Sequence, residues 1–413
     1  MNPENKTVAG SKIAATRSQR GLGVYVQVPF CQTKCTYCNF HTGVVSGARF
    51  APYVDAVCQE IRGWRELYRR AGLRCEEECD FAAETVYIGG GTPSLLDPGL
   101  LERVMRTIRE TFPSEARATR EGTLEGTLEA DPETVTLEKA RAWVAAGINR
   151  VSFGVQSFVD RELVAAGRMH RRADVHRAHA ILRAAGIGNI SFDLIAGLAW
   201  QTRESWRESL EELRKLSPEH VSVYLLEVDE GSRLGRELIQ GGPRYSAGGV
   251  PSDDEMAEFY ETACAILKGA GYEHYEISNW AKPGHASRHN LKYWNREPYL
   301  GFGAGAHSFA GKERWANTHD AAEYVKAIDG GRLPVEQQEA VSSDMALEEE
   351  LFLGLRKLEG IDVRRIEKEY DTEIRERFAE FEKAGLVECQ GDMVRLAEGK
   401  LSISNEVFVG LMK

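Results

Sequence analysis

Three cysteines lie close together near the start of the sequence, in the segment VPFCQTKCTYCNF. Cys31, Cys35 and Cys38 follow the spacing CxxxCxxC, which predicts that one tight loop carries all three thiolates. Thiolates are soft ligands that suit an iron–sulfur cluster or a zinc ion. Three thiolates on a 4Fe–4S cluster would leave one iron open, whereas zinc would need a fourth ligand, which His41 could supply. Reduced structural thiols are the third interpretation.

An iron with an open coordination position can bind S-adenosylmethionine (SAM) through its amino and carboxylate groups. One electron from the cluster then cleaves the S–C5′ bond of SAM and yields a 5′-deoxyadenosyl radical. The protein has to position SAM, provide a route for the electron and exclude side reactions. Tyr37, between the second and third cysteines, could pack against the adenine and so favours this interpretation.

Further candidate ligand-binding residues follow the cysteines along the chain. The segment IGGGTPS, at residues 88–94, contains three consecutive glycines. Such a run lets the backbone approach a ligand closely, and its amides could bind a carboxylate or an amine. Polar residues also stand at or just after the ends of the next expected strands. Each alone could merely tie loops together, but as a ring they could hold the ribose and methionyl groups of SAM; they are Glu129, Gln156, Arg168 and Asp193.

A repeated pattern of strand and helix must position these residues. From Gly23 to about Leu226, short β-branched segments alternate with longer amphipathic segments. This alternation predicts a parallel sheet, and six such units predict an α/β fold of the partial (β/α)6 TIM-like barrel type, with a doubly wound sheet as the alternative. The expected strands are 24–28, 85–88, 127–129, 150–154, 190–195 and 221–225, and the expected helices include 52–70, 100–111, 137–146, 172–185 and 205–216.

The composition of the chain divides it into three parts. Residues 1–20 are polar and predict a flexible N-terminus, and residues 21–335 would form the barrel core with an extension. From about 336 to 413, charged helical segments precede a hairpin-like VECQGDMVRL, which predicts a small helical, winged-helix-like domain. Within the core, residues 227–254 are rich in Gly, Pro and Ser and predict a long surface loop.

The overall charge narrows the function classes. With 52 basic and 63 acidic residues the net charge is 52 − 63 = −11, which argues against a general nucleic-acid binder. No apolar segment approaches the roughly 18–20 residues of a membrane span, and the N-terminus lacks the apolar core of a signal peptide. Eight cysteines in 413 residues form no disulfide framework. We therefore expect a cytoplasmic protein with at most peripheral membrane contact.

These motifs together resemble the oxygen-independent coproporphyrinogen III oxidase-like family of radical SAM proteins, over nearly the whole chain. The matching stretches are YVQVPFCQTKCTYC, GGGTPS, LEADP, VSFGVQS, GRMH and DLIAGL. The resemblance implies a radical SAM barrel with a small C-terminal helical domain. It also implies that SAM is contacted by Tyr25, Gly90, Gly91, Thr92, Glu129, Gln156, Arg168 and Asp193.

The family contains oxygen-independent coproporphyrinogen III dehydrogenases and heme chaperones of the HemW type. The dehydrogenases carry a further Cys two residues after the third ligand, where this chain has Phe40, and a longer segment than the 24 residues that precede Tyr25 here. The heme chaperones carry the motif HNxxYW, which is HNLKYW at residues 289–294. His289 would then be an axial ligand for heme iron, and Tyr293 and Trp294 would offer flat apolar surface. A packed segment with a hydrogen-bonded histidine is the alternative.

The leading hypothesis is therefore a radical SAM heme chaperone. It would hold a 4Fe–4S cluster, SAM and heme, receive electrons from a donor, and pass heme to acceptor hemoproteins, without a nucleic-acid partner. The second hypothesis is a radical SAM enzyme that abstracts hydrogen from a porphyrinogen propionate chain or modifies another substrate. The third is a zinc-stabilised barrel without redox chemistry.

Overall fold

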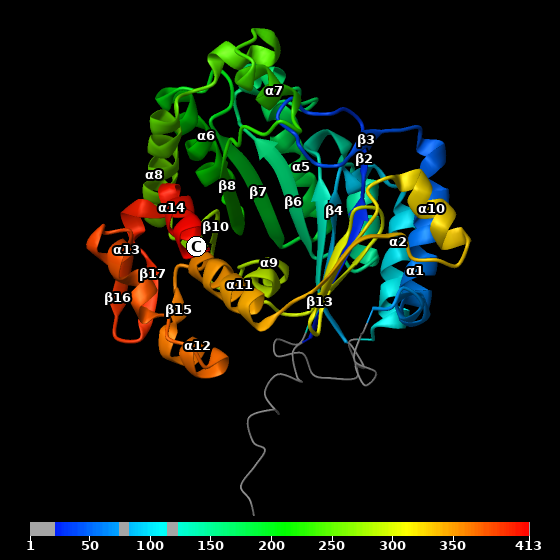
Figure 1. Ribbon diagram of the computed structural model, residues 1–413. Coiled ribbons are helices and arrows are strands. Elements are labelled where there is room, and N and C mark those ends of the chain that lie inside the picture. Colours follow the sequence, from blue (N-terminus) through cyan, green and yellow to red (C-terminus); the bar gives the residue numbers. More distant parts are fainter. Residues whose placement is uncertain (1–20, 74–81, 114–122, 413) are drawn as a thin grey trace, which may run out of the picture.

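A curved sheet of twelve strands forms the centre of the computed structural model, which describes residues 21–73, 82–113 and 123–412 (Figure 1). The flexible N-terminus expected for residues 1–20 lies outside the described residues. Six parallel strands stand next to one another in chain order: β1 (Leu22–Val28), β4 (Ala83–Gly90), β5 (Glu125–Ala130), β6 (Arg150–Gln156), β7 (Asn189–Ala196) and β8 (His220–Leu225).

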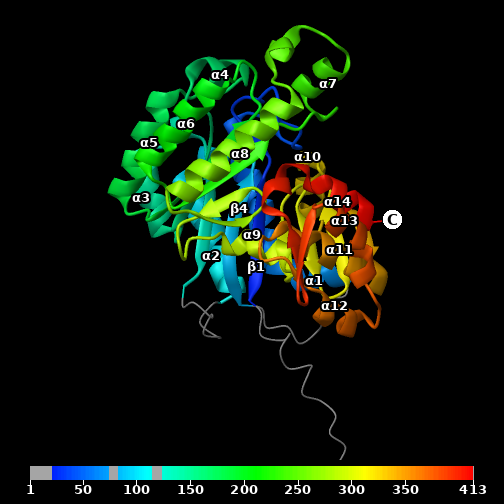
Figure 2. The same cartoon turned by 90° about the vertical axis from the view of Figure 1, so that its left-hand side faces the viewer.

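A helical connection follows each of these strands and packs on the outer face of the sheet. Figure 2 shows α3, α5, α6 and α8 next to one another on this face. Strands in unbroken chain order confirm the predicted (β/α)6 barrel, because a doubly wound sheet would reverse its order midway. The helices are α1 (Phe50–Arg70), α2 (Pro98–Thr111), α3 (Leu137–Ala145), α4 (Asp160–Ala165), α5 (Arg172–Ala185), α6 (Arg203–Leu216) and α8 (Asp253–Gly269).

The two faces of the parallel strands differ in polarity. Apolar residues such as Val24, Ile88 and Phe192 are fully buried in the core beneath the helices. The residues that alternate with them face the barrel interior and are largely polar, among them Tyr25 and Glu129. Successive side chains of a strand point to opposite faces, so each strand supplies both the core and the site.

Further strands extend both edges of the sheet. At the β1 edge, β11 (Tyr299–Phe302) pairs in parallel with β1, and β12 (His307–Ala310), β13 (Glu313–Asn317) and β14 (Val335–Ala340) follow in antiparallel order. At the other edge, β10 (Asn279–Ala281) and β9 (Glu273–Glu276) extend β8. Between the two edges the chain forms α9 (Arg288–Trp294), and α10 (Ala321–Asp329) links β13 to β14. The short strands β2 (Phe30–Cys31) and β3 (Gly43–Val44) pair separately.

The C-terminal region combines helices with a three-stranded sheet and lies beside α8 and α9 (Figure 1). Strand β14 belongs to the large sheet and ends at Ala340, so the boundary after residue 335 stays a prediction. Among the described residues, no helix has the length and apolar composition needed to cross a bilayer. The elements are α11 (Ser343–Arg356), β15 (Ile361–Asp362), α12 (Val363–Tyr370), α13 (Ala379–Lys383), β16 (Val387–Gln390), β17 (Met393–Leu396) and α14 (Ser404–Leu411).

The long loop expected at residues 227–254 is a correction to the sequence prediction. This stretch contains the helix α7 (Arg233–Ile239) and a 3₁₀ segment at Arg244–Gly249. Ser232 caps α7 by accepting a hydrogen bond from the amide of Gly235, and Leu234 is buried in a second apolar cluster. A capped helix with a buried anchor is stable despite the Gly, Pro and Ser composition around it.

Candidate cluster and cofactor site

The cysteine loop connects β1 to α1 at the C-terminal end of the parallel strands. Cys31 ends β2, while Cys35 and Cys38 follow in the loop, and all three are free, half-buried thiols. The amide of Thr36 donates to the carbonyl of Ala166 at 3.0 Å, which fastens the loop to the barrel. Burial raises the pKa of the Cys31 and Cys38 thiols above the ordinary value, and a neighbouring thiolate adds to each shift.

This donor set fits a 4Fe–4S cluster. Within the described part of the chain, no three His, Cys, Asp or Glu side chains converge to hold one metal ion. A zinc site requires such convergence on a single atom, whereas a cubane cluster distributes three thiolates over three irons. The half-buried loop with three thiols therefore suits the cluster better than it suits zinc.

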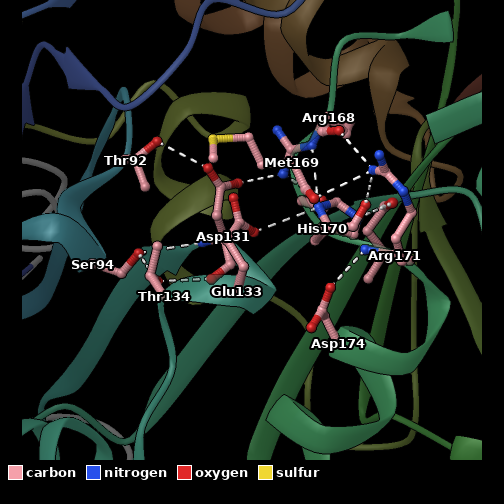
Figure 3. Close-up of polar contacts among 12 residues, drawn as sticks. Thr92, Ser94, Asp131, Glu133, Thr134, Arg168, Met169, His170, Arg171 and Asp174 are labelled. Atoms are coloured by element: carbon pink, nitrogen blue, oxygen red, sulfur yellow. Dashed lines mark hydrogen bonds and ion pairs between the residues drawn. The ribbon is translucent and has the colours of Figure 1, made fainter. Parts of the chain in front are cut away.

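A buried cation lies against the cysteines. Arg168 donates from Nη1 to Sγ of Cys35 at 3.5 Å and from Nη2 to the carbonyl of Gly154 at 2.8 Å. Its Nη2 also forms an ion pair with Asp131, and Asp131 accepts a hydrogen bond from Oγ1 of Thr92 at 3.0 Å (Figure 3). Burial opposes the charge, but Asp131 and the Cys35 thiol raise the pKa of the guanidinium. The guanidinium therefore lies against the cysteine loop as a hydrogen-bond donor to Cys35.

Asp131 is a candidate site residue that the sequence analysis missed. It stands two residues after Glu129 in LEADP, and only the glutamate of that motif is among the predicted site residues. The signal was present, because an acidic residue directly after a strand end can meet the arginine that another strand end supplies.

Hydrogen bonds of His170 and Arg171 fix the turn that carries Arg168. His170 is fully buried, and its Nε2 lies 3.0 Å from the carbonyl of Val155. Arg171 donates from Nη1 to the carbonyls of Arg168 and His170, as Figure 3 shows. Burial and then the Arg168 charge lower the pKa of His170 to about 4, so the imidazole is neutral at pH 7. These contacts fix the guanidinium beside Cys35.

The glycine segment supports the cysteine loop. Gly90 has φ +112°, a conformation that favours glycine, and its amide donates to Oε2 of Glu129 at 2.9 Å. A Cβ on Gly91 would stand 2.5 Å from the carbonyl oxygen of Phe30, so only glycine fits against the loop. The amides of Gly91 and Thr92 donate to the carbonyls of Val28 and Phe30. The amides thus have partners within the chain, and SAM contacts by Gly90, Gly91 and Thr92 stay a prediction.

Two buried carboxyl groups face the barrel interior below the cysteine loop. Burial raises the pKa of Glu129 to about 7, against the opposing effect of its Gly90 hydrogen bond. Asp193 accepts hydrogen bonds from Oγ of Ser152 at 2.9 Å and from Oγ of Ser191 at 3.3 Å. Burial also raises the pKa of Asp193. Both groups can accept hydrogen bonds from hydroxyl or amino groups of a ligand.

The other expected SAM contacts surround these carboxyl groups. Gln156 is 9% exposed and has φ 64° at an irregularity of β6, where backbone strain is typical of functional sites. Tyr25 donates from its hydroxyl to Oε1 of Gln27 at 2.5 Å. Tyr37 is partly buried against the second apolar cluster, which includes Leu198 and Leu234. The structure places Gln156 at the C-terminal end of β6 and Tyr37 in the cysteine loop, whereas Tyr25 stands in the middle of β1. Their contacts with SAM stay predictions.

The HNLKYW motif forms α9 and closes the opposite, N-terminal end of the barrel. His289 is 1% exposed; its Nδ1 lies 2.8 Å from Oγ1 of Thr85 and its Nε2 lies 2.9 Å from the hydroxyl of Tyr293. Burial, followed by the charges of Lys292 and Arg150, lowers the pKa of His289 to about 3.

Both imidazole nitrogens of His289 are therefore engaged, and neither is free for a heme iron in this arrangement. The guanidinium of Arg356 lies over the Trp294 ring, 4.5 Å from its centroid. The structure brings His289 and Tyr293 together but keeps His289 away from the cysteine loop. Heme contacts by His289, Tyr293 and Trp294 stay a prediction.

Comparisons with known proteins agree with this geometry. The Radical SAM superfamily model matches residues 25–213, and the HemN C-terminal domain model matches residues 341–399. The heme chaperone HemW of Bacillus subtilis (strain 168) is 34% identical over 389 residues, which cover 93% of this chain and 97% of that protein. HemW of Lactococcus lactis subsp. lactis (strain IL1403) is 33% identical and covers 88% of both chains.

A solved structure supports the fold. Coproporphyrinogen III oxidase HemN from Escherichia coli superimposes with a TM-score of 0.78 over 96% of this chain and 91% of that one, at 23% identity. This likeness confirms the radical SAM barrel with its C-terminal helical region. Because identity above 30% extends along almost the whole length of a curated relative, this chain belongs to the HemW family of the radical SAM superfamily.

Proposed function

We propose that this chain is a radical SAM heme chaperone. It binds a 4Fe–4S cluster on Cys31, Cys35 and Cys38, binds SAM beside it, and carries heme as cargo for acceptor hemoproteins. The cluster site is best supported by the chain of contacts from Thr92 through Asp131 and Arg168 to Cys35. The chaperone function is supported by the similarity of this chain to proteins named heme chaperones. A cytoplasmic location and an electron donor for the cluster belong to the same proposal.

Each residue of the site has its own role in this proposal. A bound cluster supplies an open iron for the amino and carboxylate groups of SAM and one electron. Arg168 balances the negative charge of the thiolates, and Asp131 holds the guanidinium in place. Glu129, with a pKa of about 7, can donate or accept a hydrogen bond near neutral pH, and Asp193 accepts one. The proposed SAM contacts are Tyr25, Tyr37, Gly90, Gly91, Thr92, Glu129, Gln156, Arg168 and Asp193.

Anaerobic reconstitution tests the cluster. Iron and sulfide content and visible absorbance should indicate about four irons per chain, the composition of a 4Fe–4S cluster. Cys31→Ala, Cys35→Ala and Cys38→Ala should each lose the cluster. Cys264→Ala and Cys389→Ala are matched controls, because these half-buried thiols lie outside the loop and should keep it. Full cluster content in a loop variant, or stoichiometric zinc in protein purified without oxygen, would overturn the assignment.

Two further assays separate the chaperone from an enzyme. Phe40 is 66% exposed at the position where the dehydrogenases carry a further cysteine. We expect the reconstituted protein to bind heme and to pass it to an apo-hemoprotein, followed by heme absorbance. With SAM and a reductant it should not convert coproporphyrinogen III. Steady porphyrinogen turnover would instead make this chain a radical SAM enzyme.

A further inference from the structure

A cavity of about 560 Å³ lies between the cysteine loop, the inner face of β1 and the strands β11 and β12. Its walls include the rings of Tyr25, Phe40, Tyr293 and Tyr299. This volume falls within the roughly 300–1,000 Å³ of small-molecule and cofactor sites. The cavity is therefore large enough for a flat aromatic ligand, and it borders the proposed cluster site through Phe40.

Three histidines also line this cavity, and none of them belongs to HNLKYW. They are His41 in the cysteine loop, His307 in β12, and His319 just after β13. The rings of His41 and His319 have centroids 3.8 Å apart. Nδ1 of His319 is buried without a hydrogen-bond partner, unlike the two bonded nitrogens of His289. An unpartnered buried nitrogen in a cavity wall calls for an explanation, and a ligand in the cavity supplies one.

The chemistry of these imidazoles selects the ligand class. In the part of the chain that the structure describes, no three metal-ligating side chains converge, so a bare metal ion would lack a complete donor set. Heme iron already has four porphyrin nitrogens and needs only one or two axial ligands. Burial, and then the neighbouring His319, lower the pKa of His41 and His307, so both are neutral at pH 7, as ligation requires.

Two cations and one carboxylate lie near the cavity, and the carboxylate, Glu336, accepts a hydrogen bond from the amide of His319 at 3.2 Å. Nζ of Lys34 lies 3.5 Å from the carbonyl of Phe40, at the cavity mouth, and Arg314 acts electrostatically on His307. A cation near an apolar, aromatic wall matches a macrocycle with carboxylates at one edge. Tyr293 is the residue of HNLKYW that lines the cavity. Its hydroxyl contacts Nε2 of His289, which lies outside the cavity wall.

We propose that heme binds in this cavity and that the His41–His319 pair supplies its axial ligand, with His289 supporting Tyr293 from behind. This inference rests on the proposed chaperone function, because it assumes that heme is the cargo. It places the cargo directly beside the cysteine loop. The histidine of HNLKYW then has a structural role.

Heme titration into the reconstituted protein, followed by difference absorbance in the Soret region, tests this placement. Losing an outer partner of a metal ligand already costs about 10- to 100-fold in affinity, so the double variant His41→Ala/His319→Ala should lose at least as much. Its cluster content should stay unchanged. His176→Ala is the matched control, because this partly exposed imidazole lies on α5, outside the cavity.

Phe40→Glu is a second variant, chosen because an exposed side chain can be replaced without disturbing the packing of the core. Phe40→Glu changes an exposed side chain and places a carboxylate at the cavity mouth, so it should weaken heme binding by repelling the propionates. Unchanged heme affinity in both the double variant and Phe40→Glu would overturn the cavity site, as would loss of the heme spectrum in His289→Ala alone. No heme binding by the unaltered protein would instead overturn the chaperone function, and this inference with it.

Discussion

The two ends of the barrel use similar polar side chains in opposite ways. At the N-terminal end, α9 places His289 and Lys292 in a network in which each has several partners. At the C-terminal end, the cysteines are half-buried thiols, Nδ1 of His319 has no partner, and Gln156 has a positive φ. Fully bonded side chains such as His289 and Lys292 stabilise the fold, whereas an unbonded imidazole nitrogen and a strained backbone retain binding capacity.

This comparison shows that the role of a motif depends on which end of the barrel carries it. HNLKYW and CQTKCTYC both contain side chains that can bind metals. In barrels of this type, active sites stand at the C-terminal ends of the strands, and the N-terminal face serves stability. We therefore expect substitutions at α9 to act on stability and substitutions around the cysteine loop to act on binding.

The largest stability effect is expected at Lys292. Its side chain is 4% exposed, and its ammonium pairs with Glu84 at 2.5 Å and Glu297 at 3.1 Å. Lys292→Met leaves these carboxylates without their buried cation, and breaking such a pair costs about 3–5 kcal/mol. Thermal unfolding measures the loss, with Glu66→Ala in an exposed pair on α1 as the control that should change little. Equal melting temperatures for both variants would contradict the stabilising role of this end.

The next effect is expected at His289. His289→Ala deletes a fully buried ring and leaves the Thr85 and Tyr293 hydroxyls without their shared partner. An unsatisfied buried group costs about 1–3 kcal/mol, and the cavity adds to this. We expect a lower melting temperature with unchanged cluster content. A variant that keeps its stability but loses heme would show that α9 is the heme site.

At the C-terminal end, Asp193→Ala should weaken SAM binding and leave the cluster in place. Losing a hydrogen bond to a charged group costs about 1.5–3 kcal/mol, or roughly ten- to a hundredfold in affinity. Equilibrium binding of SAM to reconstituted protein measures this. Ser209→Ala is a control, because this serine is buried outside the barrel interior, on α6. Undiminished SAM affinity in Asp193→Ala would move the SAM site elsewhere.

Much of the fold could be predicted because its signals are local. The strand expected at 150–154 is Arg150–Gln156, and the helix expected at 172–185 is Arg172–Ala185. The cysteine loop was equally accessible, since its ligands lie within eight residues of one another. Hydrophobic periodicity and short spacing do not depend on the tertiary structure.

The rest depends on contacts between distant segments. His41 and His319 are far apart in the sequence, and they meet only because β11 pairs with β1 and carries β12 and β13 to that edge. The spacing of HNLKYW likewise does not reveal which end of the barrel the helix closes. The position of Asp131 after a strand end can be seen in the sequence, but its pairing with Arg168 cannot. Sequence periodicity assigns a face to a residue but not its neighbours across the fold.

The last expected effect is a gradual one, a pH dependence at Glu129, whose pKa burial raises from the ordinary 4.5 to about 7. Between pH 4.5 and 7 the native protein holds a proton that the unfolded chain has released, so this group lowers the free energy of unfolding as the pH rises through that window. One proton gives at most about 1.4 kcal/mol per pH unit. Urea unfolding from pH 5 to 7.5 should therefore show a shallower decline for Glu129→Gln.

Glu60 provides a matched control for this prediction. Burial also raises its pKa to about 7, but its carboxylate accepts from Tyr324 at 2.5 Å and Asn317 at 2.9 Å, away from the barrel interior. Glu60→Gln should flatten the pH profile of stability in the same window and leave SAM affinity unchanged, whereas Glu129→Gln should alter both. If both variants changed SAM affinity alike, Glu129 would have no special place in the site. Equal slopes in the unaltered protein and Glu129→Gln would mean that this carboxyl does not titrate in the native barrel.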